Sequence, residues 1–366
     1  MISKRILFLL PSLRSGGAER QAVTIAVLLK QLGYDVEFLV YFKEGFYEPI
    51  LSQAGIKINR KVCNYLRRMI YVTNVVRHGH YDIVISFMPT PNFLNGFAAF
   101  LLGKGWKMII SERTALESNL TSRKGRIYGF FYRRTDAIVC NSNNACNLWR
   151  KNYPFLSGRL HTIYNTVTLG KIDTSYLPFR NNRLNVVVAA TIYSVKNPMG
   201  LMEALAMMTN EERNKLHIDW YGKTEAIIGD HMEYDKVVNY IRNQHLEDVV
   251  TLHNATKDIA NRMNEADCVA LFSQLEGLPN AICEGMMLSK PIIMSRCSDY
   301  NVLIEEGVNG YLCDWDNPSS IKDALLKLAN HSKEQWIAMG ESSKEKAEHL
   351  FSKDVIIQKW LDVIEG

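Results

Sequence analysis

The sequence contains no long hydrophobic run. Its apolar stretches are broken by Gly, Lys or polar residues before they reach the roughly 18 residues that a membrane-spanning helix needs. The start, MISKRILFLLPSLRSGG, imitates a signal peptide, but its apolar core from Ile6 to Leu10 is shorter than the minimum of about 7 residues, and no small-residue cleavage site follows. We therefore expect a cytoplasmic protein whose first apolar run is a buried strand.

Paired cysteines are also missing. The seven cysteines include no C-x-x-C pair, and several of them lie in apolar segments. This usage is typical of reduced structural thiols in a cytosolic protein, and it argues against a disulfide framework or a dithiol redox motif.

The chain lacks the common phosphate-binding signatures as well. Neither G-x-G-x-x-G nor G-x-x-x-x-G-K-[ST] is present, so neither a dinucleotide fingerprint nor a P-loop is supported. The first apolar run is instead followed by Gly16 and Gly17 in the stretch SGGAER, ahead of an amphipathic segment. Paired glycines at a strand-to-helix turn let the backbone approach a ligand closely, and a helix amino terminus favours negative charge. Many such turns carry two glycines, so this feature alone is a weak signal.

The overall charge is modest, but the two halves of the chain differ strongly. The whole sequence carries a net charge of +5, whereas residues 1–170 hold 23 Lys plus Arg against 9 Asp plus Glu, a net of +14, which leaves −9 for the remainder. A basic first half predicts an anionic partner, such as a phosphorylated substrate, an acidic membrane surface or nucleic acid.

Strand-like apolar runs alternate with helix-period segments, which predicts a doubly wound α/β architecture. The runs are Arg5 to Leu10, Val36 to Tyr41, Ile83 to Phe87, Met108 to Ser111, Ala137 to Cys140, His161 to Tyr164, Asn185 to Ala190, His217 to Gly222, Val249 to His253, Cys268 to Phe272, Pro291 to Ser295 and Gly310 to Cys313. The pattern restarts after the polar, turn-rich segment Asn165 to Arg183, which we take as a linker. We therefore predict two Rossmann-like domains facing a central cleft, residues 1–170 and 171–349, with the C-terminal helix at about 350–366 packing back on the first.

The stretch EGLPNAICE places two glutamates eight positions apart, at Glu276 and Glu284. Proline is tolerated in the first turn of a helix, so we expect a helix from about Pro279 to Leu288, with Glu276 in the preceding loop at the carboxyl end of a strand. Eight helical residues would span roughly 12 Å, so the two carboxylates cannot share one small ion and would contact different parts of a larger ligand. In open α/β sheets ligands bind at this edge.

Lys196 occupies the equivalent position after the first strand of the second half. It lies in the stretch KNP, just before a helix expected from Pro198, where an ammonium group can meet a phosphate. The simpler interpretation is a solvated surface lysine, which is the commoner situation for a single lysine.

The ordered set of these loops resembles the retaining glycosyltransferases of the GT-B fold, specifically family 4. The stretches that carry the resemblance, over essentially the whole chain, are SGGAER, ISF at Ile85 to Phe87, SER at Ser111 to Arg113, VCNS at Val139 to Ser142, IYN at Ile163 to Asn165, KNP at Lys196 to Pro198, EGLPNAICE, and GVNGYL at Gly307 to Leu312. The Glu-x7-Glu element with GLPN inside it is the most specific of them.

The resemblance implies roles for individual residues. The donor-binding residues would be Gly16, Gly17, Thr191, Lys196, Glu276, Gly277, Leu278, Pro279, Asn280 and Glu284. Glu276 would lie by the donor sugar, Glu284 would accept hydrogen bonds from the ribose hydroxyls, and Lys196 would neutralise the diphosphate. Such cations and amides lower the barrier most where negative charge develops on the leaving group. Neither a metal nor another cofactor is then required.

Two positions depart from the family pattern. The family usually has Gly-Arg where this chain has Ala190-Thr191, and threonine cannot supply the charge of that arginine. Many relatives also carry histidine where this chain has Arg113. We hypothesise that Arg113 supplies the missing cation as a third catalytic residue beside Glu276 and Lys196, because a guanidinium suits phosphate well.

Two motifs have structural interpretations that we prefer. Asp314-Trp315-Asp316 matches the DxD pattern of metal-dependent transferases, but it precedes Asn317 and Pro318, where helix-start chemistry is expected, so we interpret it as a turn. His78-Gly79-His80 has no further metal ligands nearby in the sequence and is interpreted as the polar end of a helix.

Two segments combine cations with aromatic and aliphatic residues: Arg60 to Arg77 and Arg123 to Arg134. They could be solvated helix faces that pack on the core, or an interfacial surface that meets anionic lipid on the inner face of the cytoplasmic membrane. The excess of positive charge in the half expected to hold the acceptor favours the membrane interpretation.

We therefore predict a cytoplasmic, metal-independent, retaining glycosyltransferase that moves a sugar from a nucleotide diphosphate donor, UDP before GDP, to a saccharide hydroxyl. The expected acceptor belongs to bacterial surface polysaccharide or lipid-linked oligosaccharide synthesis. The alternatives are a catalytically weak sugar-nucleotide binder, favoured by Thr191, and another GT-B enzyme such as a nucleotide-sugar epimerase or a phosphorylase. Nucleic acid is not an expected partner, because no recognised binding motif accompanies the basic half.

Overall fold

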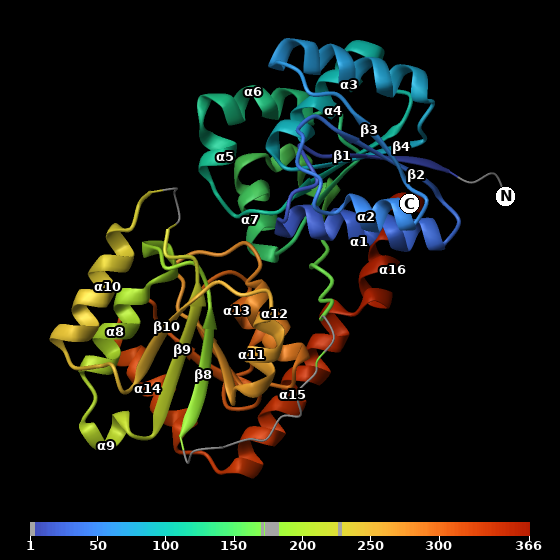
Figure 1. Ribbon diagram of the computed structural model, residues 1–366. Coiled ribbons are helices and arrows are strands. Elements are labelled where there is room, and N and C mark those ends of the chain that lie inside the picture. Colours follow the sequence, from blue (N-terminus) through green and yellow to red (C-terminus); the bar gives the residue numbers. More distant parts are fainter. Residues whose placement is uncertain (1–3, 170–171, 173–182, 226–228) are drawn as a thin grey trace. The chain divides into compact units, whose positions relative to one another are not determined.

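The structure is a computed structural model that describes residues 4–169, 172, 183–225 and 229–366 (Figure 1). The chain divides into two compact units, described separately below. Unit 1 comprises Met1–Thr166 and Lys353–Gly366, and unit 2 comprises Val167–Ser352. The predicted domain boundary between residues 170 and 171, and most of the predicted linker, lie outside the described residues.

The described part of unit 1 is built on a seven-stranded parallel sheet with the order β3-β2-β1-β4-β5-β6-β7. Its strands are β1 (Arg5–Leu9), β2 (Asp35–Val40), β3 (Lys57–Arg60), β4 (Ile83–Phe87), β5 (Lys107–Glu112), β6 (Ala137–Cys140) and β7 (Leu160–Thr162). Its helices, which cover both faces of the sheet (Figure 1), are α1 (Gly17–Gln31), α2 (Glu48–Gln53), α3 (Tyr65–Gly79), α4 (Pro89–Leu102), α5 (Ser118–Thr121), α6 (Arg123–Tyr132), α7 (Asn143–Asn152), the 3₁₀ helix η1 (Pro154–Arg159) and α16 (Lys353–Glu365).

Unit 2 repeats this architecture around a six-stranded parallel sheet with the order β10-β9-β8-β11-β12-β13 in the described residues. The strands are β8 (Leu184–Ala189), β9 (Leu216–Gly222), β10 (Val250–Asn254), β11 (Cys268–Leu271), β12 (Ile292–Ser295) and β13 (Gly310–Cys313). The helices are η2 (Ser194–Lys196), α8 (Pro198–Ala206), α9 (Asn210–Arg213), α10 (Met232–Asn243), α11 (Ile259–Glu265), α12 (Asn280–Met287), α13 (Tyr300–Leu303), α14 (Pro318–Ala329) and α15 (Lys333–Phe351).

These two parallel-sheet domains confirm the predicted α/β fold class. All twelve apolar runs named from the sequence form strands, and their ends differ from those of the strands by at most two residues. The residues of the central strands β1, β4 and β11 are almost all buried, because helices cover both faces of each sheet. Strand β3 was not predicted, because its sequence KINR, at the sheet edge, is polar and only partly buried. The basic, aromatic segment Arg60 to Arg77 begins at the last residue of β3 and contains most of α3, which begins at Tyr65.

The last helix of the chain, α16, belongs to unit 1. Trp360 is fully buried there, and its ring stacks on Phe87 with 6.2 Å between centroids. The Tyr34 hydroxyl donates a 2.6 Å hydrogen bond to Glu365. Burying an aromatic side chain of this size contributes several kcal/mol, so α16 is an integral part of the core of unit 1.

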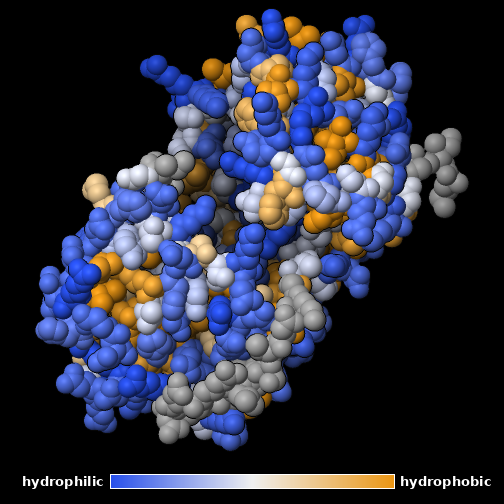
Figure 2. All heavy atoms as spheres, in the orientation of Figure 1, coloured by the Kyte–Doolittle hydropathy of each residue, from blue (hydrophilic) through white to orange (hydrophobic). Residues whose placement is uncertain are grey.

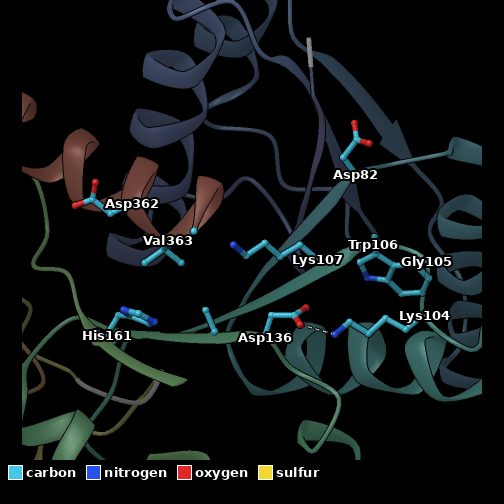
Figure 3. A pocket seen from close by; sticks show the side chains of 11 residues that line it. Asp82, Lys104, Gly105, Trp106, Lys107, Asp136, His161, Asp362 and Val363 are labelled. Atoms are coloured by element: carbon cyan, nitrogen blue, oxygen red, sulfur yellow. Dashed lines mark hydrogen bonds and ion pairs between the residues drawn. The ribbon is translucent and has the colours of Figure 1, made fainter. Parts of the chain in front are cut away.

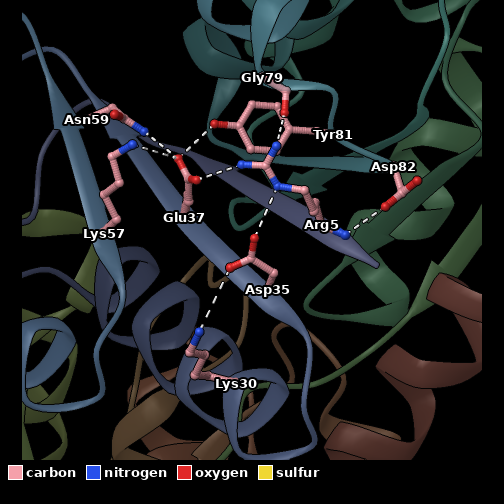
Figure 4. A network of polar contacts seen from close by, with 9 residues as sticks. All are labelled: Arg5, Lys30, Asp35, Glu37, Lys57, Asn59, Gly79, Tyr81 and Asp82. Carbon is pink, nitrogen blue, oxygen red and sulfur yellow. Dashed lines mark hydrogen bonds and ion pairs between the residues drawn. The ribbon is translucent and has the colours of Figure 1, made fainter. Parts of the chain in front are cut away.

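A charged network closes the amino edge of the unit 1 sheet (Figure 4). The Arg5 guanidinium contacts Asp35 at 3.1 Å and Glu37 at 2.9 Å, and Glu37 also accepts hydrogen bonds from Tyr81 and Asn59. Burial opposes charge on Glu37, but these hydrogen bonds and the nearby cations outweigh it and hold the pKa of that carboxyl below its ordinary value. The network joins β1, β2, β3 and the turn before β4, which indicates a structural role.

No helix in the described part of the chain combines the length and the apolar character needed to span a bilayer.

Candidate active site

Three neighbouring strands of unit 2 end at the same edge of the sheet and supply the predicted donor-site residues. β8, β11 and β12 are adjacent and parallel, so the loops that follow them lie side by side at their carboxyl ends. The loop after β8 carries Thr191 and Lys196, and the loop after β11 carries Glu276 and Gly277. Residues 80 positions apart in the chain are thereby brought together.

Lys196 and Glu276 form an ion pair at this edge. The Lys196 Nζ lies 2.5 Å from Glu276 Oε1, and the Ser273 hydroxyl donates a 2.7 Å hydrogen bond to the same oxygen. The side chain of Lys196 is 27% exposed and that of Glu276 only 12%. The lysine is therefore not the freely solvated surface residue of the simpler interpretation, because a carboxylate holds it in place at the ligand-binding edge of the sheet.

Hydrogen bonds from neighbouring strands hold the loop that carries Glu276. The amide of Gln274 donates to the carbonyl of Val195 at 2.8 Å, which ties this loop to the one that carries Lys196. On the other side, the Ser295 hydroxyl donates to the Ser273 carbonyl at 2.5 Å, and the Ser298 hydroxyl donates to the Gly277 carbonyl. Hydrogen bonds therefore fix the loop of Glu276 on both of its sides, so the ion pair is held in a preorganised position.

The GLPN segment leads directly into α12. Pro279 is the residue before the helix, with φ −76° and ψ 86°, and the first helical residue is Asn280. Leu278 and Pro279 are buried, whereas Gly277 and Asn280 remain partly accessible. The expected helix from Pro279 to Leu288 is thus one residue shorter at each end. Its amino terminus faces the edge of the sheet where Glu276 lies, as anion binding at a helix start requires.

Glu284 lies within α12 and is partly buried, whereas Glu276 lies in the loop before it. The structure therefore confirms that the two glutamates belong to different elements. The Cys283 thiol, next to Glu284, has a pKa well above its ordinary value, first because of burial and then because of the Glu284 charge. It is a structural thiol on the core side of the helix.

The KNP stretch is fixed by an unusual backbone conformation at Asn197. This residue has φ 57° and ψ 48°, and its side chain accepts a 3.2 Å hydrogen bond from the amide of Gly200 and caps α8. A Cβ atom at Gly200 would overlap the Asn197 side chain, so glycine is required for this close approach. The Asn197 side chain also donates to the carbonyl of Trp315 at 2.7 Å, which fixes the backbone directly after Lys196.

The DWD sequence is a turn before α14. Asp314 forms a 3.0 Å ion pair with Arg296, and the side chain of Asn317 accepts hydrogen bonds from Ser319 and Ser320 as the cap of α14. The predicted helix-start chemistry is confirmed. In the same way, His80 is the C-cap of α3, and His78 contacts the carbonyl of Asn74 one turn earlier.

Thr191 follows β8 in a closely packed turn. The carbonyl of the preceding Ala190 accepts a 2.7 Å hydrogen bond from the Trp220 indole and lies so close to Gly222 that a Cβ atom there would overlap it. The backbone at this position is therefore well fixed, but the threonine side chain brings no charge to it.

In unit 1, Gly16 and Gly17 form the start of α1. Gly16 is the residue before the helix, with φ −138° and ψ 157°, and Gly17 is the first helical residue. Glu19 in the first turn is 2% exposed and forms a 3.0 Å ion pair with Arg14. A Cβ atom at Gly16 would overlap the Glu19 carboxylate, so a larger residue at this position would have to displace the side chain of Glu19.

Arg113 lies at the end of β5 in a largely apolar setting. Its Nη1 donates to Asn165 Oδ1 at 3.1 Å, and its guanidinium carbon lies 4.9 Å from the centroid of Phe87 and 6.0 Å from that of Trp360. Its Nε and Nη2 atoms are buried and have no hydrogen-bond partner among the residues that the structure describes. Burial lowers the pKa of Arg113 to about 10, so the side chain still carries its charge at neutral pH.

The backbone next to Arg113 is anchored by Glu112. This buried carboxylate accepts hydrogen bonds from the amide of Arg113 at 3.0 Å and from the amide and hydroxyl of Thr114 at 3.1 and 2.9 Å. Its contacts are thus to the backbone and to Thr114, so the Arg113 guanidinium is not paired with it.

A cavity of about 920 Å³ lies at the opposite, amino edge of the unit 1 sheet (Figure 3). It is lined by Lys104, Lys107, Asp136 and His161 among others, and Lys104 and Asp136 form a 2.6 Å ion pair. Burial, and then the charge of Lys107, lower the pKa of His161. None of the described residues that were predicted for the donor site lines this cavity. Its large volume therefore does not identify it as the donor site.

Several supporting residues were not predicted from the sequence. Ser273, Ser295 and Ser298 hold the loop of Glu276, and Asn165 holds Arg113. Asn165 stands in the IYN stretch, which was quoted only for its resemblance. Ser295 is the last residue of β12, and Ser273 and Ser298 lie two and three residues after the ends of β11 and β12, so a short polar residue at or near the end of a buried strand is the signal that could have indicated them.

The comparisons with known proteins agree with the two-domain fold. The family model described as "Glycosyltransferase Family 4" matches residues 15–171, and the model "Glycosyl transferases group 1" matches residues 175–346. The first match covers most of unit 1, and the second covers most of unit 2.

Three similar proteins represent the relatives. A glycosyltransferase of Haemophilus influenzae is 26% identical, and the alignment covers 99% of this chain and 100% of that protein. The UDP-Gal:alpha-D-GlcNAc-diphosphoundecaprenol alpha-1,3-galactosyltransferase of Escherichia coli is 22% identical over 84% of this chain and 80% of its own length. The crystal structure of Anabaena Alr3699/HepE in complex with UDP matches with a TM-score of 0.84 at 20% identity, covering 99% of both chains.

Proposed function

The chain belongs to the GT-B glycosyltransferases of the group 1 and family 4 type, and from this premise we propose that it moves a sugar from a UDP-sugar to a saccharide hydroxyl with retention of configuration. The observation that carries the proposal is the ion pair of Lys196 and Glu276, held at the carboxyl edge of the unit 2 sheet. This arrangement suits a ligand that has a negative diphosphate next to a polar sugar.

The proposed role of Lys196 follows from the charge that develops in the reaction. As the bond between the sugar and the diphosphate breaks, negative charge grows on the departing diphosphate, and a fixed ammonium beside it stabilises the transition state more than the ground state. The amides at the start of α12 add further positive potential. Glu276 would hold Lys196 in position and accept hydrogen bonds from the donor sugar hydroxyls.

The remaining donor contacts are proposed from the same edge. Glu284, farther along α12, would accept hydrogen bonds from the ribose hydroxyls, while Gly277, Leu278 and Asn280 would contribute backbone amides. Thr191 would lie near the diphosphate but would contribute no positive charge. Gly16, Gly17 and Arg113 are proposed contributors from unit 1.

The proposed stereochemistry needs no protein nucleophile. The leaving diphosphate can take the proton of the attacking hydroxyl on the same face of the sugar, and Lys196 with the helix amides supplies the positive charge that this step requires. We therefore propose that the reaction is metal-independent.

The donor and acceptor are proposed from the relatives together with the charge of the chain. The Anabaena structure contains UDP, and the name of the E. coli relative specifies a UDP-sugar donor and a diphosphoundecaprenol-linked acceptor. The net charge of +14 in residues 1–170 suits an anionic acceptor or an anionic membrane surface. Bacterial surface polysaccharide or lipid-linked oligosaccharide synthesis at the inner membrane face is the proposed setting.

The test is thermal stabilisation by a panel of UDP- and GDP-sugars, because a ligand that binds only the folded state raises the melting temperature. We expect a UDP-sugar to give the largest shift, and Lys196→Ala to reduce it. Lys236→Ala, which removes an exposed lysine on α10, is the matched control and should keep the shift. If no nucleotide sugar changes the melting temperature of the wild-type protein, the proposal fails.

Thr191 favours one alternative, a sugar-nucleotide binder with little catalytic power. That alternative predicts tight UDP binding without hydrolysis or transfer of any donor sugar. Measuring donor hydrolysis on the same protein that shows the thermal shift separates it from an active transferase.

A further inference from the structure

A second cavity, of about 340 Å³, lies at the carboxyl edge of the unit 1 sheet. Pro11 follows β1, Tyr41 and Phe42 follow β2, and Met88 follows β4, so the floor of the cavity is formed where three adjacent strands end. Residues of α3, α4 and α6 complete the wall. This is the edge at which parallel sheets bind ligands, in contrast to the larger cavity at the amino edge.

Arg68 is the most deeply placed cation of this cavity. It is 9% exposed, and its guanidinium carbon lies 4.1 Å from the ring centroid of Tyr41 and 4.8 Å from that of Phe42. Its Nη2 donates to the carbonyl of Cys63 at 3.2 Å, whereas its Nε has no hydrogen-bond partner in the described part of the chain. Among the described residues no carboxylate forms an ion pair with it, so a buried positive charge lines the cavity without its own counterion.

The rest of the lining adds positive potential. Lys124 is exposed at the rim, and none of the described residues that line the cavity is acidic. Residues at the starts of two helices also line it, namely Pro89, Thr90 and Pro91 of α4 and Ser122, Lys124 and Gly125 at the start of α6, so the positive ends of two helix dipoles lie at the same space. Pro89 and Pro91 have no amide hydrogen, which leaves Thr90 as the donor of that turn of α4.

The cavity also offers flat aromatic surface. The Tyr128 ring stacks on Phe93 with 4.4 Å between centroids, its hydroxyl lies 3.4 Å from that of Tyr65, and the Lys124 ammonium lies 5.4 Å from its centroid. Such a surface suits a sugar ring or an apolar chain next to an anion.

Large apolar side chains are exposed on the two helices that flank the cavity. On α3, Leu66 is 73% exposed and Ile70 61%; on α6, Ile127 is 60% exposed and Phe130 50%. Figure 2 shows hydrophobic side chains among hydrophilic ones over the part of unit 1 where Figure 1 places these helices. Exposed apolar groups interspersed with cations mark a surface that meets an amphiphile rather than free water.

We propose that this cavity binds the phosphate-bearing end of an amphiphilic acceptor, with Arg68 and Lys124 on the phosphate and the apolar side chains of α3 and α6 along the hydrocarbon chain. The inference rests on the proposed transferase function, and it names the acceptor class as an alkyl or prenyl phosphate ester that carries the sugar to be extended. Arg68 supplies the buried charge, and Lys124 at the rim adds a mobile one.

The test uses geranyl diphosphate as a soluble prenyl phosphate, inorganic diphosphate as the anion alone and octyl glucoside as a neutral amphiphile. Binding is measured by calorimetry on the full chain carrying Lys196→Ala, so that the proposed donor site is weakened as a competing diphosphate site. We expect geranyl diphosphate to bind at least about tenfold more tightly than inorganic diphosphate and octyl glucoside not to bind, because both the charge and the chain are recognised.

Matched variants locate the site. Lys124→Gln should weaken geranyl diphosphate about tenfold, as expected for the loss of one charge-assisted contact. Arg123→Gln removes a neighbouring exposed charge on α6 that does not line the cavity, and it should change the affinity less than twofold. Arg68→Lys keeps the charge but not the fork of donors and should also weaken binding, with a melting curve to show that the variant folds.

Three results would overturn the inference. Equal losses from Lys124→Gln and Arg123→Gln would mean general electrostatic attraction, and equal binding of the two diphosphates would remove the role of the hydrocarbon chain. Binding of anionic vesicles, but not of geranyl diphosphate, would mean a membrane surface without a discrete site. If geranyl diphosphate binds as expected while no UDP-sugar stabilises the wild-type protein, the proposed ligand of the cavity is supported and the proposed donor reaction is refuted.

Discussion

Lys196 of unit 2 and Arg113 of unit 1 are cations at the carboxyl ends of strands, yet their surroundings are opposite. Lys196 is partly exposed and held by the carboxylate of Glu276, whereas Arg113 is buried against Phe87 and Trp360 with one hydrogen bond from its guanidinium, to Asn165. In the described structure its Nε and Nη2 have no partner.

This difference indicates how each cation could bind an anion. A partly exposed lysine has three donor hydrogens, so Lys196 can contact a phosphate while it keeps the carboxylate of Glu276. A buried guanidinium with unpaired donors is costly, and such groups are typically retained where an anion completes them. We therefore predict that Lys196 contributes mainly to the rate of the reaction. We also predict that Arg113 lowers the stability of the folded protein and contributes to its function.

The largest expected effect is that of Lys196→Ala on turnover. Removing one preorganised group that stabilises developing charge typically lowers kcat by about 100- to 1000-fold, and we expect a loss in that range with a smaller rise in KM for the donor. Steady-state kinetics of sugar transfer check this, with Lys236→Ala as the control. A lysine variant with unchanged kcat would assign the diphosphate charge to another residue.

Next in size is the effect of Arg113→Met. We expect turnover to fall about 10- to 100-fold while the melting temperature stays the same or rises, because methionine removes a buried charge and keeps the contact with Phe87 and Trp360. Kinetics and thermal unfolding are measured on the same preparation. Unchanged donor affinity and turnover would refute the hypothesis that Arg113 supplies the missing cation.

The substitution Thr191→Arg tests whether an arginine at position 191 can replace the charge of Arg113. If Arg113 provides the charge that Thr191 lacks, the new arginine should restore about tenfold of the turnover lost in Arg113→Met and should add little to the wild-type enzyme. A double-mutant cycle on kcat/KM gives the coupling. Equal gains in both backgrounds would show that the two positions act independently.

The smallest expected effect concerns stability, and it extends the comparison to a buried cation of unit 2. Lys290 is fully buried and donates to the carbonyl of Asn264 at 2.6 Å, and burial lowers its pKa to about 7 although Asp267 favours the charge. Its folded pKa is below its unfolded value, so the unfolded chain binds more protons between pH 7 and about 10.5, and stability should rise with pH across that window.

Denaturant unfolding at pH 7 and pH 9 measures this effect. We expect the free energy of unfolding to gain about 1 kcal/mol from Lys290 between these pH values, which is less than the theoretical maximum because Asp267 is coupled to it. Lys290→Met should remove this part of the slope. Identical slopes for the two proteins would mean that Lys290 keeps its proton in the folded state.

Much of the fold could be predicted from local sequence. Runs such as ILFLL and VVVAA are too apolar to be anything but buried, so they gave the parallel strands, and Pro279 gave the start of α12 to within one residue. The edge strand β3 was missed because only one side of an edge strand packs, and KINR carries no continuous apolar signal.

The candidate site was predictable in its residues but not in their contacts. Sequence indicated Lys196 as a single lysine and Glu276 as a loop glutamate, and neither pattern specifies that they form an ion pair. The aromatic cluster around Arg68 could be recognised only as basic and aromatic composition, since its partners Tyr41 and Phe42 come from a different element.

The sequence by itself determined the strands, the helix starts and the loops that carry charge, because these depend on the side chains of a few consecutive residues. Tertiary structure alone decided which charges meet. The order of the strands places β8 next to β11, which brings Lys196 to Glu276. Arg113 lies against Phe87 and Trp360 and has no ion-pair partner among the described residues. The physical reason is that strand order is set by the packing of whole helices and strands, a long-range property that no local pattern encodes.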